Sequence, residues 1–197
     1  MGETGKNIVD GFRTLRKFCN EVSIMLKTAD GMMEDANWMP ISNKTLDTTS
    51  VISNPDWWMP YELFRYYQHD EFPHLLPYIA INLDDPLKDE NDIVINEALV
   101  SAGMIDYGSG NNYQDFEYWF CRAHLFMEDR EDNGKLFFID NPHQEWEDKE
   151  WVGAIKVTTF AHPLDTITNS DILKSKIVQP LIDAIQRSIG ISEKKIA

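Results

Sequence analysis

The stretch IVINEALVSAGMI, residues 93–105, decides the predicted fold class, because its run of β-branched and aliphatic side chains is typical of a strand. Gly103 predicts an interruption or a bend near the end of that strand. A second apolar run, YIAINL at residues 78–83, precedes it, and the acidic stretch DDPLKDEND separates the two. We therefore expect two strands joined by a loop rather than by a helix.

Further strands are expected towards the C-terminus. Residues 119–127 alternate in polarity, which predicts a half-buried strand, and residues 151–160 predict another. Asp132, Asn133 and Gly134 predict a tight turn into KLFFID, residues 135–140. We favour a three-residue loop with Gly134 in the left-handed conformation, which sets Met127 opposite Ile139; a two-residue loop would set it opposite Asp140.

Amphipathic helices are expected at both ends of the chain. Apolar residues recur at steps of three and four from residue 6 to residue 27, and Asp30 with Gly31 predicts a stop. The second helix is expected to start with a capping box at residues 168–171, to kink or break at Pro180, and to end near residue 189. The fold prediction is one α+β domain, residues 1–197, with a helix at about 5–28, a strand-rich middle at about 76–160 and a helix at about 170–189. The sheet is expected to be mainly antiparallel and packed against both helices.

The net charge of −15 is concentrated in the middle of the chain. Residues 28–171 carry eight basic and 28 acidic side chains, a difference of −20. Such a field disfavours nucleic acid and anionic membranes and leaves a basic protein, a small cationic ligand or a divalent metal as candidate partners. The alternative is that the acidic charge serves only to keep the protein soluble. The N-terminus does not resemble a secretory signal, and two well-separated cysteines indicate reduced thiols in a cytoplasmic protein.

Aromatic residues crowd into NPDWWMPYELFRYYQHDEFPH, residues 54–74. We expect a short helix at residues 61–67 whose two apolar sides cannot both face one core. Leu63 and Phe64, with Trp58, are expected to be buried, and part of the cluster is expected to lie at the surface. Trp, Tyr and Arg are enriched in binding hot spots. The predicted partner-binding residues are Trp57, Trp58, Tyr61, Arg65, Tyr66 and Tyr67. The alternative is ordinary core beneath a long loop.

Clustered carboxylates provide the candidate metal site. DREDNGKLFFID, residues 129–140, matches a calcium loop in part, and the acidic residues that follow are similar to the carboxylate and Glu-x-Lys pattern of metal-dependent nucleases. The candidate ligands are Asp129, Asn133, Asp140 and Glu147, with Asp84 and Asp85 as a second choice.

No nucleophile elbow, phosphate loop or dinucleotide fingerprint occurs in the chain, so no cofactor is expected other than a divalent metal at those carboxylates. Arg122, His124 and Lys156 are expected to share the sheet face opposite the core, where a histidine can act as a general base. The predicted function is a non-catalytic binding module that uses the aromatic segment beside acidic loops; the alternative is a metal-dependent hydrolase or nuclease. The oligomeric state is left open.

Overall fold

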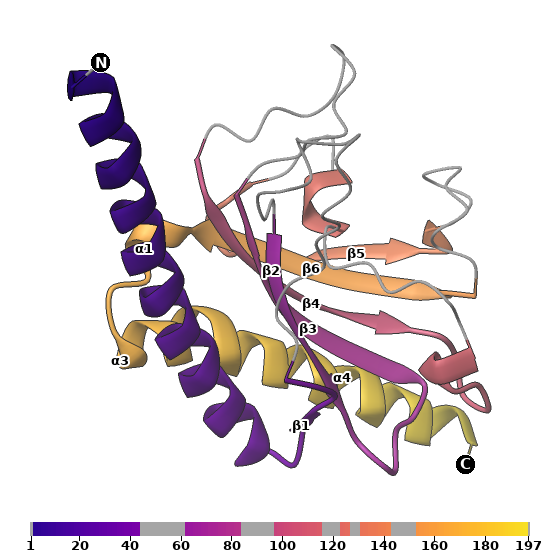
Figure 1. Cartoon of the computed structure of the whole chain (residues 1–197). Helices are drawn as coiled ribbons and strands as arrows, with labels where there is room; N and C mark the ends of the chain where they lie inside the picture. Colours follow the sequence, from indigo (N-terminus) through magenta and orange to yellow (C-terminus); the bar gives the residue numbers. More distant parts are fainter. Residues whose placement is uncertain are drawn as a thin grey trace.

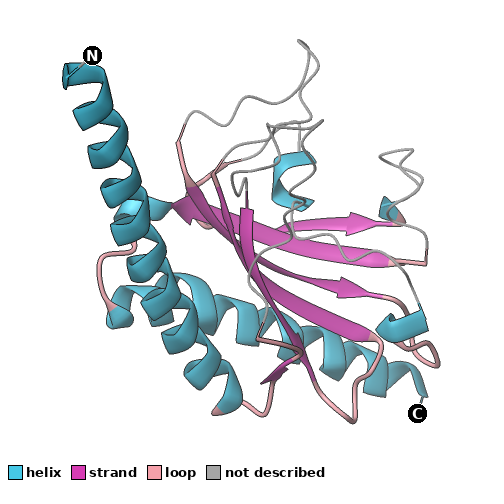
Figure 2. Cartoon of the chain, in the orientation of Figure 1, coloured by secondary structure: helices cyan, strands magenta, loops and turns pink. Residues whose placement is uncertain are grey.

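The computed structural model describes residues 2–43, 62–83, 97–115, 123–126, 131–142 and 153–196. Within these residues, six strands form one sheet in the order β1-β2-β3-β4-β6-β5, and every neighbouring pair is antiparallel. The strands are β1 Met39–Pro40, β2 Glu62–Gln68, β3 Leu75–Asn82, β4 Leu99–Asp106, β5 Phe137–Asp140 and β6 Lys156–Pro163. With helices before and after the strands, this confirms the predicted α+β class (Figures 1 and 2).

Long helices occupy both ends of the described chain. The first is α1, Gly2–Glu34, and the last is built from α3 Ser170–Leu173, the π-helical turn η6 Lys174–Val178 and α4 Gln179–Ile196. The 3-10 turns η2 Tyr113–Asp115, η3 Ala123–Phe126 and η5 Leu164–Thr166 connect strands and helices. The interruption expected at Pro180 takes the form of the π turn Lys174–Val178, which ends two residues before it. Pro180 has no backbone N–H to donate to the preceding turn, and the wider π turn accommodates this missing hydrogen bond.

The stop predicted at Asp30 and Gly31 is wrong, because α1 continues to Glu34. Ala29 and Met33 extend the buried stripe of the helix, and their packing outweighs the roughly 1 kcal/mol that a glycine costs in a helix. The chain leaves the helix at Asn37, whose φ of 66° is left-handed.

Apolar side chains cover both faces of the sheet. On one face, α1 and α4 pack over residues from β2, β3, β4 and β6, including Leu63, Ile79 and Phe160. On the other face, a second cluster forms around Tyr78, Ile105 and Val157. Every residue of β3 is buried as a result, so the strand has no alternation of apolar and polar positions.

The secondary-structure prediction for the aromatic segment is wrong. The helix expected at residues 61–67 is strand β2, with Leu63 paired to Ile81 and Tyr66 to Tyr78. A strand with two covered faces can bury both sides of an aromatic run, so two apolar sides do not require a helix with one side at the surface.

The strand expected at residues 119–127 is also wrong where it is described, because Ala123–Phe126 form a 3-10 turn. Strand β5 pairs with β6, with Ile139 opposite Val157, while Met127 lies outside the described residues. The left-handed conformation predicted for Gly134 is confirmed by its φ of 88°. Strand β6 starts at Lys156, later than expected, and continues to Pro163.

Gly103 does not interrupt β4, whose pairing with β3 and β6 continues through it. Tyr78 and Thr159 are its partners on the two sides, and the Tyr78 hydroxyl lies 2.9 Å from the Thr159 Oγ1. A Cβ at position 103 would lie 2.7 Å from that hydroxyl and 2.2 Å from the Thr158 carbonyl oxygen. Glycine is therefore required here by the Thr158 carbonyl and by the Tyr78 side chain that crosses over it.

Candidate functional site

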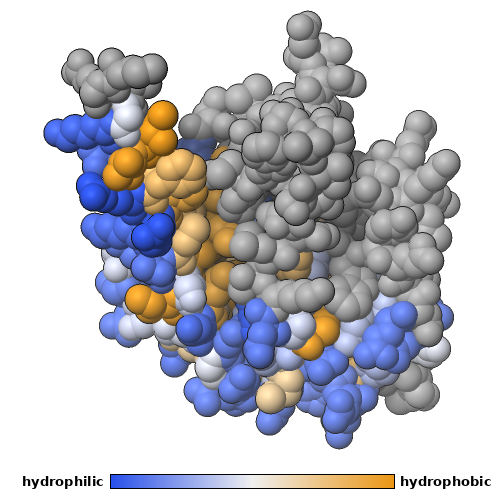
Figure 3. Space-filling model, viewed as in Figure 1, coloured by the Kyte–Doolittle hydropathy of each residue, from blue (hydrophilic) through white to orange (hydrophobic). Residues whose placement is uncertain are grey.

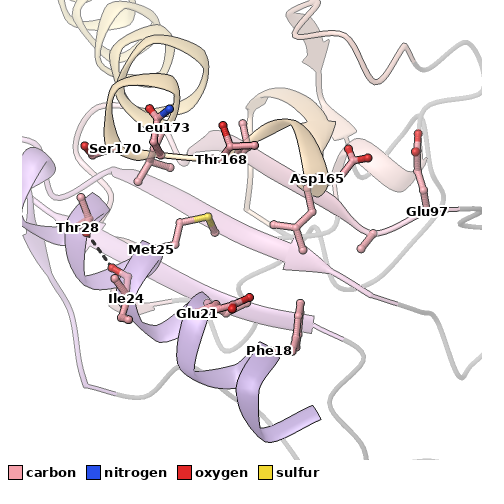
Figure 4. Close-up of a pocket in the computed structure, with 15 residues that line it drawn as sticks. Phe18, Glu21, Ile24, Met25, Thr28, Glu97, Asp165, Thr168, Ser170 and Leu173 are labelled. Atoms are coloured by element: carbon pink, nitrogen blue, oxygen red, sulfur yellow. Dashed lines mark hydrogen bonds between the residues drawn. The ribbon is translucent and has the colours of Figure 1, made fainter. Parts of the chain in front are cut away.

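A groove of about 780 Å³ lies beside the middle of α1. Its walls come from three parts of the chain that are distant in sequence: Phe18 to Thr28 on α1, Glu97 and Ala98 just before β4, and Leu164 to Leu173 across η5 and α3 (Figure 4). A volume of this size is within the range of small-ligand sites and also holds a few side chains of a helix.

Local hydrogen bonds fix the wall opposite α1. The backbone N–H of Leu164 donates to the Ala98 carbonyl at 2.8 Å, which ties the end of β6 to the residues before β4. The Asn169 side chain caps the helix that follows by accepting from the backbone N–H of Ile172 at 3.0 Å. Asn169 lies within the expected capping segment, one residue after Thr168. The α1 wall is fixed by the buried side chains of Val22 and Leu26.

The groove has an apolar floor and an acidic rim. Met25 points into it from α1 (Figure 4), and Val22 and Leu173 also line it. The carboxylates of Glu97 and Asp165 lie together at one end, and that of Glu21 projects from α1. All three rim residues are exposed. Among the described residues that line the groove there is no histidine, cysteine or lysine, and this lining can accommodate an apolar group next to a positive charge.

The predicted partner-binding residues that the structure describes are not at the surface. Tyr67 is fully buried, Arg65 is 5% exposed and Tyr66 is 8% exposed. Leu63 is buried and Phe64 half-buried. The expectation of surface positions is therefore wrong for Arg65, Tyr66 and Tyr67, which are core, whereas Trp57, Trp58 and Tyr61 lie outside the described residues.

A buried charge network explains why an arginine can lie in the core. Arg65 Nε donates to Asp30 Oδ1 at 3.0 Å and its Nη2 donates to Asp30 Oδ2 at 2.8 Å, while Nη1 donates to the Ser42 carbonyl. The Tyr67 hydroxyl donates to Asp30 Oδ1 at 3.1 Å. Burial, followed by the negative charge of Asp30, raises the pKa of Tyr67, which keeps the phenol a neutral donor. These side chains join β2 to α1.

The candidate metal ligands are only partly described. Asn133 and Asp140 are both exposed, and Asp84, Asp85, Asp129 and Glu147 lie outside the described residues. The Asn133 amide donates to Glu131 at 3.0 Å and accepts from the backbone N–H of Lys135 at 3.1 Å, which makes it part of the turn. Across the described part of the chain, no three histidine, cysteine, aspartate or glutamate side chains lie close enough to hold a metal ion.

His124 does not lie on an exposed sheet face. It is fully buried in η3, its Nε2 lies 2.8 Å from Asp132 Oδ1, and its ring packs against Phe137 with centroids 5.8 Å apart. Lys156, the other described member of the expected set, is half-buried on β6. A general base must reach the substrate, so a buried imidazole held by a carboxylate fits a structural role better than a catalytic one.

Comparisons with known proteins add no family: no family model, no curated protein and no solved structure matches this chain. None of the described helices has both the length and the apolar character to cross a membrane. Sequence reasoning missed the groove, because it is assembled from three distant segments whose individual patterns are those of an ordinary helix, a loop and a helix start.

Proposed function

We propose that the protein is a non-catalytic binding module and that the groove beside α1 holds an apolar, positively charged part of its ligand. The observation that carries this proposal is the groove itself, an apolar channel of about 780 Å³ with carboxylates at its rim. An apolar floor supplies affinity by removing ligand surface from water, and the rim selects the sign of the charge.

The ligand is a protein segment or a small cationic amphiphile, and the overall charge supports that choice. With a net charge of −15, the chain attracts cations before contact and repels anionic competitors. The free thiol of Cys19 supports placing the protein in a reducing compartment, the cytoplasm.

The ε-methyl resonance of Met25 reports directly on the groove, and Met25→Leu identifies it among the methionine signals. We expect dodecyltrimethylammonium, added below its micelle-forming concentration, to shift this resonance saturably, and dodecyl sulfate to shift it less. A Met25 resonance that responds equally to both probes, or to neither, contradicts the proposal.

A matched pair of variants tests the location. Ile24, an exposed groove residue, and Phe138, an exposed residue of β5 that is not in the groove, are each replaced by lysine. Ile24→Lys removes apolar surface and adds a positive charge that repels dodecyltrimethylammonium. It should therefore raise the Kd of this probe at least about tenfold, which corresponds to about 1.4 kcal/mol. Phe138→Lys should leave binding unchanged. Equal effects of the two variants would place the probe elsewhere.

A further inference from the structure

The N-terminal part of α1 has an apolar face that no described element of the chain covers. We name residues 5–17 the arm. Among the side chains of α1 whose burial is described, the first buried one is Val22, and the arm projects beyond the sheet (Figure 1). Ile8 is 56% exposed, Val9 48% and Phe12 62%, and the orange stripe on the projecting part of α1 marks this region in Figure 3. Helices in proteins gain most of their stability from packing of such a face, so the arm requires a partner.

The arm and the groove are complementary in charge. The arm carries four basic side chains and one acidic one, which gives it a net charge of +3. Since the whole chain has a net charge of −15, the rest of the chain carries −18. The basic side chains are Lys6, Arg13, Arg16 and Lys17. The groove presents Glu21, Glu97 and Asp165 around an apolar floor. An exposed apolar stripe flanked by positive charge is the kind of ligand that the groove selects.

The arm and the groove are also continuous. The groove begins at Phe18, one residue after the arm ends, and both lie on the same helix. When the arm of one copy lies in the groove of a second copy with the two α1 helices antiparallel, the arm of the second copy is brought to the groove of the first. Both contacts are then related by one two-fold axis, which closes the assembly at two chains.

We propose that the protein is a homodimer in which the two copies exchange arms, each arm occupying the other copy's groove. The proposal rests on the proposed function, because it uses the same groove, and it names the occupant. A second copy fits better than an anionic membrane, since the −18 remainder of the chain would be repelled by the lipid surface to which the arm would bind.

Sedimentation equilibrium of the full chain over a wide range of concentration measures the dimer directly. Phe12→Glu disables the arm and Thr168→Trp fills the groove, and both positions are exposed, so both variants should fold. Each variant should raise the dimer dissociation constant at least about tenfold, or about 1.4 kcal/mol. Phe138→Glu, outside both surfaces, should leave it unchanged.

A mixture of the two variants provides the decisive measurement. The Phe12→Glu chain keeps an intact groove and the Thr168→Trp chain keeps an intact arm, so the mixture regains one of the two contacts. It should associate more tightly than either variant alone. A mixture that associates no better than its components overturns the exchange.

The two proposals fail separately. A wild-type chain that remains a monomer at every concentration refutes the arm exchange, whereas a Met25 response to dodecyltrimethylammonium still supports the groove as a binding site. If the exchange is correct, the monomeric Phe12→Glu chain has an open groove and should respond to the probe at lower concentration than wild type. If the wild-type chain is a dimer but Met25 does not respond to dodecyltrimethylammonium in either the wild-type or the Phe12→Glu chain, both proposals are refuted.

Discussion

Replacing Asp30 by alanine should destabilise the protein by about 3 kcal/mol. The substitution leaves the Arg65 guanidinium, 5% exposed, without its bidentate carboxylate, and leaves the Tyr67 hydroxyl without its acceptor. Breaking a buried ion pair by removing one partner typically costs about 3–5 kcal/mol. We take the lower end, because Asp30 is itself 16% exposed and Arg65 keeps its hydrogen bond to the Ser42 carbonyl. For a domain of this size, the loss corresponds to a fall in Tm of roughly 6–12 °C.

Urea unfolding at neutral pH, followed by tryptophan fluorescence, measures the free energy of unfolding. Asp10→Ala is the matched control on the same helix, since it removes an exposed ion pair with Arg13 and should cost about 0–1 kcal/mol. The double variant Asp30→Leu with Arg65→Met removes both charges and should recover much of the loss. An Asp30→Ala loss no larger than that of Asp10→Ala would refute the view that this network joins β2 to α1.

Two further predictions concern backbone space and protonation. Gly103→Ala should lower the free energy of unfolding by about 2–3 kcal/mol, because the new Cβ would lie 2.2 Å from the Thr158 carbonyl oxygen. Gly31→Ala, whose new Cβ has nothing within 4 Å, should stabilise the protein by up to about 1 kcal/mol. Equal shifts in Tm for the two variants in a calorimetric scan would contradict this. Burial and, to a smaller extent, the charge of Lys176 lower the pKa of His162, so the unfolded chain binds a proton at higher pH than the folded one. The contribution of His162 to the free energy of unfolding should therefore be fully present above about pH 6.5 and be lost as the pH falls below that value. His162→Gln should make Tm less dependent on pH in this range. If Tm falls with pH as steeply in His162→Gln as in the wild type, this prediction is refuted.

The fold class was accessible from sequence, because the terminal helices show a helical spacing of apolar residues and the apolar runs of β3 and β4 are typical of buried strands. The assignment of β2 was not accessible, because its pattern depends on what covers it. Tyr66 and Tyr67 point to opposite faces of the sheet and are both buried. Arg65 is acceptable in the core only because of a carboxylate 35 residues earlier in the chain, and no local pattern contains that information.

The candidate site was less accessible than the fold. A search for motifs finds residues that are close in sequence, whereas Met25, Glu97 and Asp165 meet only after the sheet and the two terminal helices have packed. The exposed apolar stripe of the arm has the same helical spacing as the buried stripe that follows it. The sequence therefore predicted a single core-facing helix where the structure has a buried half and an exposed half.

The π turn at Lys174–Val178 bears on how the chain length of this protein can vary in evolution. A π turn contains one residue more than the α-helical turn it replaces, and the faces before and after it both pack against the sheet. A relative that lacks one residue in this segment can form an uninterrupted α-helix and keep both faces in place. We expect single-residue insertions and deletions among relatives to gather at this turn, whereas elsewhere in the same helix a change of one residue would rotate the following apolar face by about 100°.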